Sequence, residues 1–275
     1  MKFASNSSPT LLVRFIFALA LPVSFLFTAD LDALAAPITI DCSASPTITL
    51  GVNFNTGDDL TLNSGGDTGG TCTLTTDQDE AGADSEIALN SLTLSESIIL
   101  THSISDTTAN HHNEIDLVIT GALTVNTGSS INVDGKGYLG GSHAPNSGSS
   151  TGRTATNTIT GGSTYATGGS HGGRGGYYSG TYPGAVSYDS ITSPVLPGGG
   201  GAQGGSVTGG DGGGVVIITA ASATIDGNIS ANGNTNTAAG GGGGTINLTI
   251  TGTVSGGGSL TANGADGASG YLGGG

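Results

Sequence analysis

The densest run of potential metal ligands lies between residues 77 and 86, where carboxylates follow one another closely. Carboxylate oxygens are ligands that Ca²⁺ prefers in proteins. An EF-hand loop needs Asp or Asn at its fifth position and Glu at its twelfth, but a loop starting at Asp77 has Ala81 and Ala88 there. The run therefore predicts only a weak calcium site, and no other cofactor is expected. The candidate ligands in this run are Asp77, Asp79, Asp84 and Glu86.

A second polar group lies in the glycine-rich segment Ser170–Gly176, which reads S-H-G-G-R-G-G. His171 and Arg174 can each donate hydrogen bonds, and crowded backbone carbonyls need donors. We expect these two side chains to hold the loop in place, with direct ligand contact as the alternative. Three tyrosines follow closely, and large amphipathic rings suit contact surfaces. We expect them to point outward; they are Tyr177, Tyr178 and Tyr182.

Catalytic groups are scarce after residue 35, where Lys136, Arg153 and Arg174 are the only basic side chains besides His. A polysaccharide-acting β-helix enzyme, one alternative function, would need clustered acids or a metal with a base on one face. The glycine runs within 196–214 and 240–244 are not phosphate loops, because no G-K-[ST] follows them. The chain is therefore not predicted to be an enzyme.

Charge is distributed unevenly along the chain. Residues 36–135 hold 14 Asp and Glu and no Lys or Arg, whereas residues 136–275 hold 4 acidic and 3 basic side chains. An acidic surface repels phosphate backbones, so nucleic acid is not an expected partner. A glycan or another surface protein fits this charge better.

The first 35 residues have the order of a secretory signal peptide. Lys2 and Arg14 precede an apolar run, Phe15–Phe27, and a small-x-small cleavage site follows at Ala33–Ala35. A membrane anchor is the alternative, but this run is shorter than the ~20 residues that a span needs. No later segment is apolar enough to span a bilayer. The mature protein is therefore expected to be secreted or exposed at the cell surface.

Two cysteines remain after residue 35, Cys42 and Cys72. An even number of cysteines in an exported protein favours a disulfide. We expect the bond to fix an acidic N-terminal capping region, residues 36–84.

Internal repeats predict the architecture of residues 85–275. Three copies of one unit begin near Ile115, Ile217 and Leu248, and each alternates apolar and polar residues over short stretches. Such alternation is typical of strands with one buried face, and a repeat of about 30 residues is typical of stacked coils. We therefore expect an all-β fold, a right-handed parallel β-solenoid, with a β-sandwich as the alternative. The residues expected to point inward are Leu117, Ile119, Ile217, Leu248, Ile250 and Leu260.

A long insertion, residues 136–214, interrupts this pattern and is rich in Gly, Ser, Thr and Tyr. Insertions in repeat proteins often carry the binding face. The chain has 53 Gly in total, which predicts many turns. Gly270–Gly275 repeats the opening of the insertion, as expected for a fragment that stops where a second insertion begins.

One family resemblance covers residues 115–275. The S-H-G-G-R-G-G motif at 170–176, Tyr188-Asp189-Ser190, and the glycine-flanked repeat from Gly212 to Gly233 occur in an order that resembles large glycine-rich extracellular repeat proteins. The resemblance implies a β-helical, surface-exposed protein and no particular activity. Export, repetition and this resemblance together predict a structural or adhesive surface module.

An ice-binding solenoid is a further alternative, because it would present flat rows of outward Thr. Thr124, Thr224 and Ser255 align between repeats. A second row is not expected, since its positions read Asn132, Ser230 and Thr261.

Overall fold

The computed structural model divides the chain into two units, residues 1–34 and 35–275, and each is considered by itself. It describes residues 37–49, 53–67, 69–75, 86–178, 182–235, 238–268 and 272–275, all in the second unit. The expected signal peptide and three of the calcium candidates, Asp77, Asp79 and Asp84, lie outside the described residues. Within these ranges no helix is long and apolar enough to cross a membrane.

The described part is all-β, apart from a short 3-10 turn, Ala155–Asn157. Its strands are β1 (Pro37–Asp41), β2 (Thr47–Thr49), β3 (Asp59–Asn63), β4 (Gly70–Thr75), β5 (Ile87–Leu89), β6 (Ser91–Leu94), β7 (Ile98–His102), β8 (Ile115–Val125), β9 (Ser130–Asn132), β10 (Val215–Ile225), β11 (Asn228–Ser230), β12 (Thr245–Ile250), β13 (Val254–Ser255) and β14 (Ser259–Thr261).

These strands form two sheets in which every pairing between the named strands is parallel. One sheet has the order β1-β3-β6-β8-β10-β12, with β5 beside β8 and β13 beside β10. The other has the order β14-β11-β9-β7-β4-β2. Successive passes of the chain therefore add one strand to each sheet in turn, which is compatible with a β-solenoid. The antiparallel pairing that a sandwich of hairpins requires is absent from these strands.

Alternating apolar residues fill the space between the sheets, as their period of two predicts. Leu117 and Ile119 on β8 are buried, as expected. Leu248 and Ile250 pack against the core at partial burial. Leu260 aligns with the buried Ile229 but is itself 53% exposed, because β14 ends its sheet.

The expectation for Ile217 is wrong. Its neighbours Val216 and Ile218 are buried, and Ile218 is the residue that aligns with Leu248. The repeat offset is therefore 30 residues in this strand, although it is 31 where Ile229 aligns with Leu260. A one-residue shift moves a side chain to the opposite face of a sheet.

The region expected to act as a cap contributes strands to the same two sheets. β1 and β3 extend one sheet, and β2 and β4 extend the other. The predicted disulfide is present and joins Cys42, just after β1, to Cys72 on β4, with Cα atoms 5.2 Å apart. Both sulfurs lie in the hydrophobic core.

The glycine-rich segments form a bundle whose hydrogen bonds repeat every three residues. Successive N–H groups of residues 198–202 donate in turn to segment 209–214, to segment 167–170 and to Arg153. The fourth donor then returns to 209–214 and the fifth to 167–170. Three residues per turn without internal hydrogen bonds is the geometry of the polyproline II helix. The pattern therefore indicates extended glycine strands that bond to several neighbours at once.

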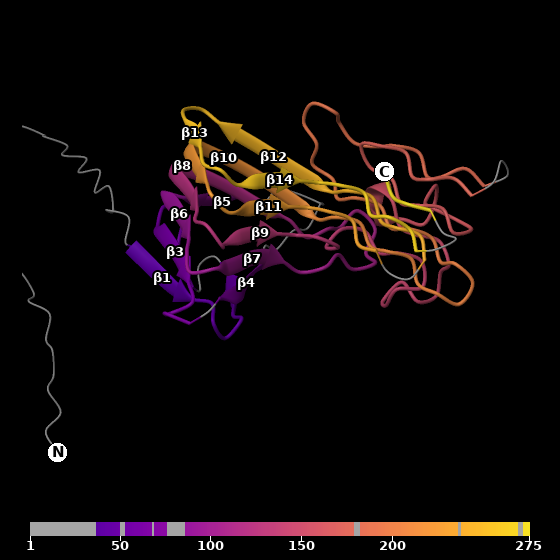
Figure 1. Cartoon of the computed structure of the whole chain (residues 1–275), viewed down its shortest axis with the longest axis horizontal. Helices are drawn as coiled ribbons and strands as arrows, with labels where there is room; N and C mark the ends of the chain where they lie inside the picture. Colours follow the sequence, from indigo (N-terminus) through magenta and orange to yellow (C-terminus); the bar gives the residue numbers. More distant parts are fainter. Residues whose placement is uncertain are drawn as a thin grey trace, which may run out of the picture. The chain divides into compact units, whose positions relative to one another are not determined.

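Segments outside the insertion complete this bundle. Residues 239–244, which lead into β12, accept from Gly210 and Gly213, and they donate to the C-terminal residues 272–275. In Figure 1 the named strands gather in one half of this unit, and the strand-free glycine segments gather in the other half with the C-terminus. The insertion is thus an ordered continuation of the coils.

Most of these glycines serve close backbone approach. A Cβ on Gly212 would collide with the carbonyl oxygen of Gly198, and one on Gly210 with that of Asn234. Neither position has a positive φ, and the described glycines with positive φ lie mainly in turns elsewhere, such as Gly57 and Gly128. The expectation that so much glycine means many turns is therefore only partly right.

Candidate binding site

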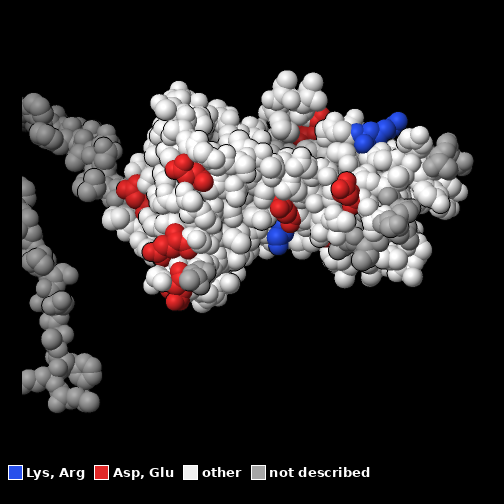
Figure 2. All heavy atoms as spheres, in the orientation of Figure 1, with Lys and Arg blue, Asp and Glu red and all other residues white. Residues whose placement is uncertain are grey.

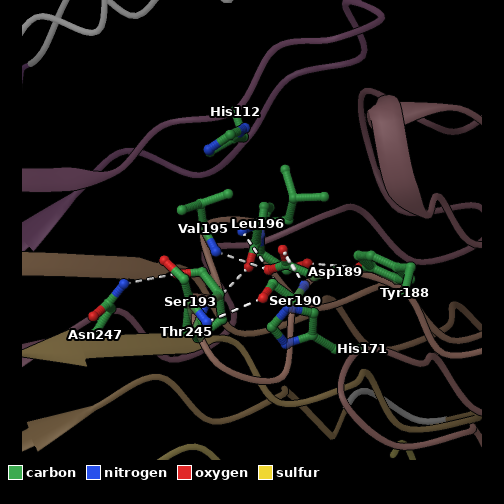
Figure 3. Close-up of polar contacts among 12 residues, drawn as sticks. His112, His171, Tyr188, Asp189, Ser190, Ser193, Val195, Leu196, Thr245 and Asn247 are labelled. Carbon is green, nitrogen blue, oxygen red and sulfur yellow. Dashed lines mark hydrogen bonds and ion pairs between the residues drawn. The ribbon is translucent and has the colours of Figure 1, made fainter.

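The insertion folds one of its outer loops, residues 188–196, around the carboxylate of Asp189 (Figure 3). Oδ2 of Asp189 accepts the N–H groups of Val195 and Leu196, each at 2.8 Å, and Oδ1 accepts that of Ser190 at 2.7 Å. Desolvation opposes ionisation here, but these hydrogen bonds and that of His171 outweigh it, so the pKa of Asp189 is lowered. The ionised carboxylate is the centre that organises this loop.

His171 anchors the same loop, but its partner is a carboxylate and not the loop carbonyls that the sequence analysis expected. Its Nε2 lies 3.1 Å from Oδ2 of Asp189, and the ring packs 5.3 Å from that of Tyr188. The Tyr188 hydroxyl donates to the carbonyl of Pro197 at 2.6 Å. Burial raises the pKa of Tyr188 well above its usual value, so the hydroxyl remains a donor. His171 is itself buried.

Arg174 differs from His171, because it is exposed and makes no hydrogen bond or ion pair with the described residues. The arginine that holds the insertion is Arg153, which donates to the side chain of Asn146 and to the carbonyl of Asn157. The amide of Asn157 in turn donates to three carbonyls of the segment 106–111. Arg174 stands in the S-H-G-G-R-G-G motif, whereas no motif around Arg153 signalled its role.

A pocket of about 380 Å³ lies between the Asp189 loop and the start of β12. Two hydrogen bonds tie these walls together, from Thr245 to the carbonyl of Leu196 at 2.7 Å and from Asn247 to that of Pro194 at 3.2 Å. The lining combines apolar groups with His171 and the Asp189 loop; it includes Tyr188, Ser190, Ile191, Pro194 and Ile246. An apolar hollow with a few fixed polar groups is the usual form of a small-ligand site.

Exposed large side chains gather on the outer loops of the insertion. Tyr177 is 67% exposed, Tyr178 47% and Ile191 91%. Tyr182 is only half-buried, because its ring stacks on that of Tyr165 with centroids 4.0 Å apart. Tyr177 and Tyr178 therefore point outward more fully than Tyr182 does. Tyr165, which the sequence analysis did not single out, is 65% exposed as well. The remaining exposed members are Ile159, Val186 and Val195.

A buried carboxylate, Asp211, lies inside the glycine bundle and pairs with the partly exposed imidazole of His143. Asp211 accepts the N–H of Gly140 and the Nδ1–H of His143, both at 2.8 Å. Burial raises the pKa of Asp211, and these hydrogen bonds offset only part of that effect. Asp211 is the charged residue of the glycine run 209–214, and its bonds to Gly140 and His143 join this run to the start of the insertion.

No metal site emerges from the remaining acids and histidines. Within the described ranges no group of three His, Cys, Asp or Glu could hold a metal ion. Glu86, the calcium candidate that falls in these ranges, is exposed. His112 is buried, with its Nε2 3.3 Å from Oε2 of Glu114.

Comparison with models of protein families, with curated proteins and with solved structures finds no match to this chain. Its function must therefore be argued from the geometry of the insertion and of the sheets.

Proposed function

We propose that this chain is an exported structural and adhesive surface module. It is built as a right-handed parallel β-solenoid that carries a glycine bundle, whose outer loops contact a glycan or another surface protein. The parallel order of both sheets and the burial of each coil by the next support the solenoid. The right-handed path follows from the usual hand of parallel crossovers.

The exposed apolar and aromatic side chains of the insertion carry this proposal. Soluble proteins rarely leave clustered large apolar side chains in water without a partner. Here seven such residues lie in the insertion, whereas only Val254 and Leu260 are comparably exposed elsewhere in the described ranges. Backbone hydrogen bonds join the glycine strands that carry these loops, so we expect little ordering free energy to be lost on contact.

Charge and the disulfide support export and surface contact. On the face shown in Figure 2, acidic side chains gather over the N-terminal strands, and wide areas carry no charged side chain. Disulfides persist mainly in oxidising compartments, which fits secretion of the chain through its N-terminal signal.

Attachment assays with matched surface variants test the adhesive role. Beads coated with the chain would be passed over cell surfaces and polysaccharide surfaces under flow, using a variant with Tyr177→Ser, Tyr178→Ser and Ile191→Ser. The control carries Val254→Ser and Leu260→Ser, which remove exposed apolar groups from the last coil. The proposal expects attachment to fall only in the first variant; equal attachment of both variants and the parent chain would refute it.

Ice binding is a second candidate, because one outward row of hydroxyl residues crosses six paired strands. The register aligns these residues one above the next, in the order Thr39, Thr61, Thr93, Thr124, Thr224 and Ser255. Paired strands lie ~4.8 Å apart, and β-branched side chains have restricted rotamers, so the hydroxyls repeat at a fixed spacing. The repeats in the sequence had aligned only three of these residues, Thr124, Thr224 and Ser255.

Ice-affinity measurements decide this second candidate. Thr124→Tyr places a large ring in the middle of the row, whereas Thr249→Tyr changes an exposed Thr on β12 outside it. The candidate expects incorporation of the labelled chain into growing ice, with loss in the first variant only. Exclusion of the parent chain from ice rules the candidate out.

A further inference from the structure

Three tyrosines on the outer loops of the insertion form one continuous group. The rings of Tyr165 and Tyr182 stack with an interplanar angle of 26°. Tyr182 also pairs with Tyr178 in an isolated antiparallel bridge, where the N–H of Tyr178 donates to the carbonyl of Tyr182 at 3.1 Å. Directly opposed residues of an antiparallel pair project to the same side. Tyr178, Tyr182 and Tyr165 therefore present adjacent rings, which we call the tyrosine platform.

The backbone at Tyr165 gives independent evidence that the platform has a use. Tyr165 has φ of 49° and Ala166 has φ of 62°, both in the left-handed region. A bulky residue rarely occupies this region, and Gly does so without strain. In a chain with 53 Gly, an aromatic residue stands at a position where Gly would be easier to accommodate. Strain of this kind persists mostly at functional sites.

Burial does not explain Tyr165 either, because its side chain remains 65% exposed. A ring that served only packing would be covered, as that of Tyr138 is, at 0% exposure. The platform thus keeps aromatic surface in water at a strained backbone position.

The charges of the insertion point to an uncharged ligand. Its two carboxylates are engaged internally, Asp189 with His171 and Asp211 with His143. Its basic groups, Lys136, Arg153 and Arg174, form no cluster in the sequence. A strongly charged ligand would therefore find no complementary field, whereas the faces of sugar rings can lie on aromatic rings through apolar contact and dispersion.

We propose that the platform of Tyr165, Tyr178 and Tyr182 binds a neutral glycan by stacking. The proposal rests on the adhesive function above and names its ligand class and contact residues.

Pull-down on purified neutral polysaccharides tests the platform, with cellulose, chitin and mannan as probes and alginate as the acidic comparison. Tyr182→Ala removes a central ring, and its dissociation constant for the bound polysaccharide should rise about tenfold. Val254→Ala is the control, because Val254 is 62% exposed but lies on β13 in the last coil, outside the insertion. Its affinity should be unchanged.

Tyr165→Gly separates a binding role from a packing role. Glycine relieves the positive φ, so the melting temperature should stay the same or rise while binding falls. A lower melting temperature would mean that Tyr165 serves stability, and it would overturn the proposal. Equal losses in the Tyr182→Ala and Val254→Ala variants would overturn it as well.

The proposal of a neutral glycan can be refuted while the proposed adhesive function still holds. Preference for alginate, or attachment to protein-coated surfaces with no retention on any neutral polysaccharide, would refute the neutral glycan and leave the adhesive role standing. If the loop variants also attach to surfaces as well as the parent chain does, both proposals fail.

Discussion

The Nε2 atom of His102 accepts a hydrogen bond at 3.3 Å from the backbone N–H of Val215, 113 residues further along the chain. The other ring nitrogen, Nδ1, donates to the carbonyl of Ser103 at 2.7 Å. The imidazole is fully buried, so both bonds require the neutral ring. His102 thus joins the end of β7 to the start of β10, where the glycine bundle meets the sheets.

Acid should weaken the fold through His102. Burial lowers its pKa from 6.5 to about 4, with Lys136 and His112 adding to the effect. The unfolded chain therefore binds the proton first, and stability that is complete above pH 6.5 declines as the pH falls toward 4. The linkage amounts to about 3 kcal/mol.

Urea unfolding at pH 7, 5.5 and 4 measures this loss. His102→Gln keeps a hydrogen-bonding side chain that does not titrate, so the variant should be less stable at pH 7 but should lose less between pH 7 and 4. Parallel pH profiles for the two proteins would show that His102 is not the group responsible.

Alanine substitutions should separate glycines of the bundle from glycines of open loops. The Cβ of Gly212→Ala would meet the Gly198 carbonyl, so neighbouring strands must separate, at a cost of about 3 kcal/mol or more. Gly148→Ala meets nothing within 4 Å and should stabilise the chain by about 0.5 kcal/mol. Thermal unfolding followed by circular dichroism compares the two. Similar melting temperatures for both variants would contradict the close packing of the bundle.

The sequence predicted the sheets well and the bundle poorly, for physical reasons. Side chains that alternate along β8 report its buried face directly, and Leu117 and Ile119 are buried as expected. The run Val215–Ile218 is apolar throughout, so alternation does not fix its phase and Ile217 was placed on the wrong face. The glycine bundle is held by backbone hydrogen bonds, so its sequence has no apolar periodicity from which it could be predicted.

The candidate site was predictable only in part. His171 stood in a distinctive motif and was expected to hold the loop by donating to carbonyls, whereas its partner is the carboxylate of Asp189. Asp189 lies 18 residues beyond its partner His171, and only the folded loop brings them together. Tyr165 precedes the tyrosine cluster in sequence, and its positive φ has no sequence signal.

Removing the disulfide should destabilise the N-terminal coils. Cys42 and Cys72 are 30 residues apart, and a loop of this length constrains the unfolded chain by about 3–4 kcal/mol. The Cys42→Ser, Cys72→Ser double variant should unfold at correspondingly lower urea, whereas reduction should have no effect on it. Labelling of unreduced exported protein with a thiol reagent should find no free thiol. Two labelled cysteines would contradict the bond.

Asp189→Asn should open the loop beside the pocket while leaving the sheets intact. An amide presents one acceptor oxygen, so it cannot replace a carboxylate that accepts from Ser190 at one oxygen and from Val195 and Leu196 at the other. The lowered pKa of Asp189 means that its contribution is present at neutral pH and is lost only as acid titrates the folded carboxylate.

Limited proteolysis at pH 7, read by mass spectrometry, should therefore find new cleavage within residues 189–196 in the Asp189→Asn variant. Asp266→Asn, at an exposed position in the last glycine segment, is the matched control and should be cleaved no faster than the parent chain. If Asp189→Asn resists the protease as well as that control does, the hydrogen bonds of Asp189 do not hold the loop.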